Sequence, residues 1–139
     1  MKPFLIVAMV LTLSSITYAQ EKEQHGEREA MRHSFALKEL GVFHDALHPL
    51  VHESYPEGDF DTIRAGLESL LEKAKAIEKA KLPKKLVGRK KEFQKQSKEL
   101  VTQLTEMIEI KDIVDDETLG MKFNDMHETF ETLVHLVGE

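Results

Sequence analysis

The chain has 139 residues and a formal net charge of -6 with its seven histidines neutral, and it contains no cysteine. Without cysteine it can form no disulfide, thiolate zinc site, iron–sulfur cluster or covalent c-type haem attachment. The acidic balance argues against nucleic acid as a partner, because a phosphate backbone requires a basic surface. Any metal must therefore be held by histidine, carboxylate, methionine or asparagine.

Residues 1–19 have the features of a signal peptide. Lys2 precedes an apolar run at residues 4–13 that is too short to span a bilayer as an ordinary transmembrane helix, and Thr17 and Ala19 suit cleavage before Gln20. We expect a periplasmic protein that is free of the membrane after cleavage, with a retained signal anchor as the alternative. Residues 20–26 are polar and lack apolar periodicity, which predicts a disordered leader.

Residues 27–139 predict one all-α domain, an antiparallel up-down-up-down four-helix bundle. Apolar residues recur at three- and four-residue intervals in four stretches: 27–53, 60–81, 84–112 and 116–137. Residues 54–59 have the composition of a turn. Asp59 stands where the N-cap of the second helix is expected, and the pair Asp115–Asp116 where that of the fourth is expected.

Pro49 lies inside the first stretch. Its ring removes the N–H that would bond to the carbonyl of Asp45, so we expect a kink or a separate short last turn there. The turn that carries His52 can then swing toward His48 or face solvent.

The stretch from Lys79 to Lys91 is strongly cationic, with seven Lys or Arg among thirteen residues. It falls at the predicted corner between the second and third helices. We interpret it as a solvated loop, with a patch for anionic lipid or another polyanion as the alternative.

Three histidines of the first helix, His44, His48 and His52, are spaced four residues apart. Residues at this spacing are neighbours on a helix, and two such imidazoles can bind one metal ion. With Leu40 as the centre of the buried stripe, they lie about 40, 80 and 120 degrees from it. We therefore expect His44 in the core, His48 at its boundary and His52 at its edge.

The fourth helix repeats this pattern. With Phe123 as the centre, His127 lies about 40 degrees away, Glu131 about 80 and His135 about 120. His44 and His127 also lie at one level, each roughly 14 to 15 Å from the shared end of the bundle.

Depending on the handedness of the bundle, equal angles turn both sets of side chains toward the groove between the two helices or away from it. If they face the groove, the matched angle and level predict a metal site formed by His44, His48, His127 and Glu131. Three imidazoles and a carboxylate suit zinc or copper(II). The alternative is that these histidines are hydrogen-bonded within a partly polar layer of the core. The sequence leaves open whether three further histidines take part: His33, His52 and His135.

The number and lengths of the helices, the turn placement and the export signal resemble the periplasmic four-helix-bundle cytochromes, the soluble b-type cytochrome and cytochrome c prime. In the b-type family a Met on the first helix and a His on the last hold the haem iron. The resemblance implies His127 on the last helix and His44 or Met31 on the first. Met31 lies about opposite the Leu40 stripe, so non-covalent haem b between His44 and His127 is the version implied.

Two other bundle families do not fit. Haemerythrin-like sites draw histidines from the interior helices, but residues 60–112 contain none. Ferritin-like sites need Glu-x-x-His pairs, whereas Glu128 and Glu131 follow His127.

The leading functional hypothesis is a periplasmic protein that binds zinc or copper for sequestration, delivery or sensing. The second is haem b electron transfer. The third is a metal-free helical interaction module, whose acidic last helix would contact a second copy or another periplasmic protein. We expect no enzyme, because the sequence shows no nucleophile–base, paired-carboxylate or phosphate-loop pattern.

Overall fold

The computed structural model describes residues 35–138, and all regular secondary structure in that part of the chain is helical. Four long helices make up most of it: α2 (Lys38–Pro49), α4 (Phe60–Glu78), α5 (Lys90–Ile110) and α6 (Asp116–Gly138). Three short segments extend them: the π-helical turn η1 (Leu50–Ser54), α3 (Tyr55–Glu57) and the 3-10 segment η2 (Lys84–Arg89). The predicted signal peptide, leader and start of the first helix lie outside the described residues.

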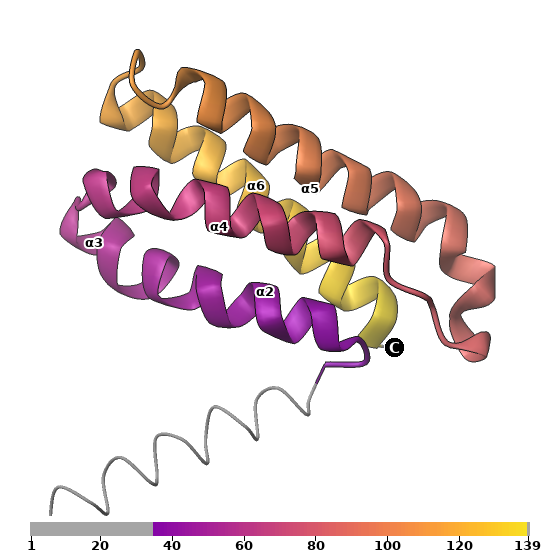
Figure 1. Ribbon diagram of the computed structural model, residues 1–139. Helices are drawn as coiled ribbons and strands as arrows, with labels where there is room; N and C mark the ends of the chain where they lie inside the picture. Colours follow the sequence, from indigo (N-terminus) through magenta and orange to yellow (C-terminus); the bar gives the residue numbers. More distant parts are fainter. Residues whose placement is uncertain (1–34, 139) are drawn as a thin grey trace, which may run out of the picture.

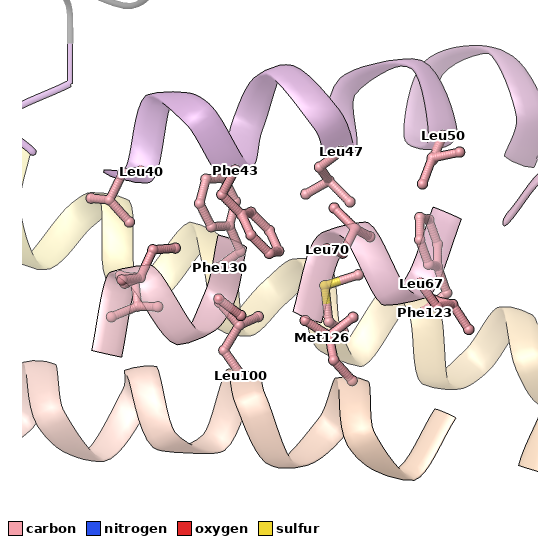
Figure 2. Packing of buried hydrophobic residues seen from close by; sticks show 14 of the residues in the cluster. Leu40, Phe43, Leu47, Leu50, Leu67, Leu70, Leu100, Phe123, Met126 and Phe130 are labelled. Atoms are coloured by element: carbon pink, nitrogen blue, oxygen red, sulfur yellow. The ribbon is translucent and has the colours of Figure 1, made fainter. Parts of the chain in front are cut away.

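The long helices lie side by side around one core (Figure 1). Helix α4 packs against α2 and α5, and α6 packs against α5. The buried side chains are the predicted apolar stripes, and Figure 2 shows Leu40, Phe43 and Leu47 of α2 pointing into this core. Burying one such side chain contributes about 1.5–3 kcal/mol, so the stripes hold the helices together.

Both predicted N-caps are confirmed. The backbone N–H of Thr62 donates to Oδ1 of Asp59 at 3.1 Å, and that of Thr118 donates to Oδ1 of Asp115 at 2.8 Å. These bonds satisfy N–H groups that have no partner within the first turn of a helix, so α4 and α6 begin within a residue of the predicted starts.

Two arginines join helix ends that are distant in sequence. Nε of Arg64, near the start of α4, donates to the carbonyl of Lys111 at 2.8 Å, and its Nη2 donates to Asp116 Oδ1 at 2.7 Å. Nη1 of Arg89 donates to the carbonyl of Leu136 at 2.9 Å. The carbonyls at the ends of α5 and α6 lack partners within their own helices, so these guanidinium groups fix how the helix ends meet.

The first predicted helix differs from the structure at residues 35–37. Residues 35–37 are not helical, although the predicted helix ran through them, and α2 starts at Lys38. The backbone of Leu37 is extended, with φ -122° and ψ 129°, and its side chain is only 6% exposed. Ala36 is exposed instead of joining the stripe. Leu37 is therefore buried by an extended segment before α2 and not by a further turn of that helix.

The turn predicted at residues 54–59 is also wrong. The helix continues through η1 and α3 to Glu57, and Gly58 ends it with a left-handed φ of 71°. The N–H of Asp59 then bonds to the carbonyl of Ser54 at 2.8 Å. Composition suggested a turn because Pro and Gly lie close together, but only the glycine breaks the helix.

The second corner differs from the prediction in detail. Helix α4 ends at Glu78, three residues early, and residues 84–89 form a 3-10 segment where an α-helix was expected. Leu82 precedes Pro83, and a residue before proline is disfavoured in the α conformation. The chain therefore leaves the helix before this pair and re-enters through a tighter turn.

Gly120 of α6 is buried where two aromatic rings meet the helix. A Cβ at this position would lie 3.3 Å from Cε1 of Phe60 and 3.4 Å from Cε2 of Tyr55. The glycine therefore allows both rings to lie against the backbone of α6.

Replacing Gly120 with valine should lower the free energy of unfolding by about 1–3 kcal/mol, because its methyl groups must displace one of the rings. The measurement is urea unfolding monitored by circular dichroism. Gly138→Val is the matched control in the same helix, since a Cβ there would have no neighbour within 4 Å. Equal midpoints for the two variants would contradict this account of the packing.

Candidate metal centre

The predicted irregularity at Pro49 is confirmed. Helix α2 ends at this residue and the π-helical turn η1 follows directly. The N–H of Leu50 bonds three residues back to Leu47, and that of Tyr55 bonds five residues back to Leu50. Proline cannot donate a backbone bond, so the hydrogen-bond pattern changes where one donor is missing.

The π turn brings His52 into line with His48. On an α-helix, two residues four apart are separated by about 400 degrees, which is about 40 degrees more than a full turn. A π turn has more residues per turn, so the angle between His48 and His52 is smaller. The ring centroids of His48 and His52 are 4.4 Å apart, closer than the 5.4 Å between His44 and His48. His48 and His52 are exposed, so the row runs from a half-buried imidazole into solvent.

His44 lies between two phenylalanine rings. Its ring centroid is 5.2 Å from that of Phe35 and 6.5 Å from that of Phe130 on α6. Its Nδ1 is buried and has no hydrogen-bond partner among the described residues. A buried polar atom without a partner costs about 1–3 kcal/mol, so this nitrogen is available for a ligand.

Burial lowers the pKa of His44 from its usual value of 6.5, and the neighbouring His48 lowers it further. His52 and His127 act in the same direction, while Asp45 opposes them. The imidazole of His44 is therefore neutral at neutral pH, which is the form that can bind a metal ion.

The remaining predicted ligands lie on α6. His127 is half-buried, and its Nε2 is 3.6 Å from Oε1 of the exposed Glu131. This carboxylate lies one turn after the imidazole, and residues four apart are neighbours on a helix surface, so the two can offer donors to the same ion. His135 is exposed, and His33 lies outside the described residues.

Of the predicted ligands, His44 lies next to His48, with ring centroids 5.4 Å apart, and Nε2 of His127 lies 3.6 Å from Oε1 of Glu131. Within residues 35–138, however, no three His, Asp or Glu side chains are arranged as a ready set of metal ligands. The set of His44, His48, His127 and Glu131 stays a prediction, and it requires exposed side chains to change rotamer, a motion of picoseconds to nanoseconds.

Beside this site, aromatic side chains fill the apolar contact between α2 and α6, which we call the seam. Phe43 of α2 and Phe130 of α6 have ring centroids 4.7 Å apart, and Figure 2 shows them in contact. A haem between His44 and His127 would have to separate these rings. Met107 and Met126 are fully buried in the core, as expected of methionines that fill space and do not bind metal.

Sequence reasoning missed two contacts beside the site, one made by Phe35 and one made by Tyr55. Phe35 reaches His44 from the segment before α2, where no periodicity applies. Asn124, one turn before His127, donates its Nδ2 to the hydroxyl of Tyr55 at 2.8 Å. The sequence predicts a turn at residues 54–59, and a turn gives Tyr55 no helix position from which the place of its hydroxyl could be inferred.

Comparison of the chain with models of known protein families, with characterised proteins and with solved structures found no match. Among the described residues, no helix is both long and apolar enough to cross a membrane.

The metal-free protein should lose stability as the pH falls below about 6.5. The pKa of His44 is lower in the folded chain than in the unfolded one, so the unfolded chain binds more protons between the two values and is favoured there. NMR titration in the presence of a chelator should show His44 titrating below 6.5. Its pKa should move upward in the His48→Gln/His52→Gln variant and stay unchanged in His135→Gln. A His44 pKa at or above 6.5 in the parent would refute this description.

Proposed function

We propose that this protein binds a divalent transition metal, zinc or copper, in the periplasm and serves metal sequestration, delivery or sensing. The proposed ligands are His44 and His48 of α2 with His127 and Glu131 of α6. The observation that carries the proposal is the buried Nδ1 of His44, which has no hydrogen-bond partner among the described residues and lies next to further histidines.

A metal ion would satisfy this nitrogen without changing the fold. The lowered pKa of His44 keeps its lone pair available at neutral pH, so binding displaces no proton from it. Phe35 and Phe130 supply an apolar wall, which limits the access of water to the ion. Both features favour a ligand role for His44 over a role in packing alone.

The chemistry of the donors favours zinc or copper(II). Imidazole and carboxylate suit both ions, and the chain has no thiolate to select copper(I). The exposed pair of His48 and His52 adds two donors at the solvent end of the row. Single π turns inside helices occur frequently at functional sites, which also favours this end of α2 as the site.

The proposal includes the up-down-up-down order of the helices. Two contacts support this order: Arg64, near the start of α4, bonds at the end of α5, and Arg89, just before α5, bonds at the end of α6. The ring contact between Phe43 and Phe130 supports α2 and α6 as direct neighbours. Their shared seam is where the proposed ligands of the two helices can meet.

Replacing both His44 and His127 with alanine should weaken zinc and copper binding at least about tenfold, because the loss of an outer-sphere partner alone costs about 10- to 100-fold. Isothermal titration calorimetry measures the affinity. The rise of the thermal midpoint with added metal should also disappear, since it depends on binding to the folded state. His135→Ala, on the exposed part of α6, is the control and should behave like the parent.

Three other results would redirect the proposal. A double variant whose midpoint still rises with metal as the parent's does would place the site elsewhere, with His25 and His33 as the next candidates. A Soret band on addition of haemin to the parent protein, lost in the double variant, would select the haem alternative. Binding of neither metal nor haemin would leave the metal-free interaction module.

A further inference from the structure

A cavity of about 490 Å³ lies at the corner between α4 and α5. Small-molecule sites in proteins are typically about 300–1,000 Å³, so the cavity has room for a small ligand. Its wall comes from residues 78–82 at the end of α4 and from residues 87–94 at the start of α5. It shares no residue with the proposed metal centre.

The wall of this cavity has a net positive charge. Lys79, Lys81 and Lys90 line it together with a single carboxylate, Glu78. Within residues 35–138, the structure records no ion pair for any of the three lysines, whereas Lys111 pairs with Glu68. Three ammonium groups around one cavity favour an anion and repel a metal ion.

The rest of the wall includes apolar side chains. Phe93 is only 2% exposed, so its ring forms the inner part of the wall, and the half-buried Leu82 adjoins it. Val87 is 59% exposed, although it is a large apolar residue on an otherwise cationic segment. A ligand that covered Val87 would remove this apolar surface from water.

We propose that this cavity binds a single-chain anionic amphiphile, of which a fatty-acid carboxylate is the simplest example. The carboxylate would pair with the lysine ammonium groups, and the hydrocarbon chain would lie against Phe93, Leu82 and Val87. A small inorganic anion would leave the apolar wall uncovered, and a neutral lipid would leave the ammonium groups without a counter-charge. Only a ligand with both parts matches the whole wall.

Calorimetric titration with decanoate, kept below its micelle-forming concentration, should show saturable binding with one ligand per chain. The Lys79→Gln/Lys81→Gln/Lys90→Gln variant should bind at least about threefold more weakly, because each exposed charge pair counts for a factor of roughly 1.4 to 5. The control removes three charges from the same segment but outside the cavity wall: Lys84→Gln/Lys85→Gln/Lys91→Gln. It should bind as the parent does, and circular dichroism should show both variants folded.

A separate variant tests the contribution of the apolar part of the wall to decanoate binding. Val87→Ser should weaken decanoate binding about fourfold or more, since each methylene-sized contact that is lost is a factor of roughly four. Ile113→Ser is the matched control, because Ile113 is equally apolar and 80% exposed at another corner. It should leave the affinity unchanged.

Several outcomes would overturn the proposal. Equal weakening in the two lysine variants would mean that a diffuse positive field attracts the anion. If acetate bound as tightly as decanoate, the cavity would recognise charge alone. If decanol did so, it would recognise apolar surface alone. Binding to vesicles of anionic phospholipid without any binding of monomeric decanoate would make this corner a membrane-docking surface. No saturable binding of decanoate would exclude the site.

Discussion

The contact between Phe43 and Phe130 sets the geometry on which the proposed site depends. Phe43 is fully buried and its ring is stacked at a tilt on that of Phe130, which fixes how α2 faces α6. His44 is the next residue along α2, about 100 degrees around the helix, so it must lie at the border of the seam. His127, one turn before Phe130 on α6, is half-buried as well. The half-buried state of both imidazoles follows from the burial of two phenylalanine rings.

The π turn extends this arrangement beyond Pro49. It lets the helix continue where an α-helical bond is missing, and it keeps Leu50 and Ser54 buried. A Cβ on Gly66 would be 2.9 Å from Cδ1 of Leu50, so the Leu50 side chain packs directly on the backbone of α4. The same turn aligns the two exposed histidines of the row. Packing on α4 and the position of His52 therefore depend on one change in backbone hydrogen bonding.

Periodicity predicted the four helical stretches and their buried faces, because both are patterns that repeat over several helical turns. Residue type predicted the cap at Asp59 and placed the other at Asp115 or Asp116, because capping involves residues only three apart; the structure uses Asp115. Neither predicted the helical state of residues 54–57, which rests on bonds across five residues and on packing against α4 and α6. The depth of His44 could be read only approximately, since an angle ignores Phe35, which covers the ring from outside the helix. Whether the proposed ligands converge depends on side-chain rotamers, and these have no signature in residue spacing.

The lowered pKa of His44 and its unpartnered Nδ1 share a main cause, which is burial beside two aromatic rings. Burial removes water from the imidazole, so it disfavours the proton and leaves the nitrogen without a bond. The same burial would penalise a bare dication, because removing an ion from water is costly unless other donors replace the water. In the proposed site, the exposed pair of His48 and His52 would hold a partly hydrated ion first, and the carboxylate of Glu131 would offset its charge. On this proposal, a row of histidines from solvent to the contact between α2 and α6 supplies the further donors that a single buried histidine lacks.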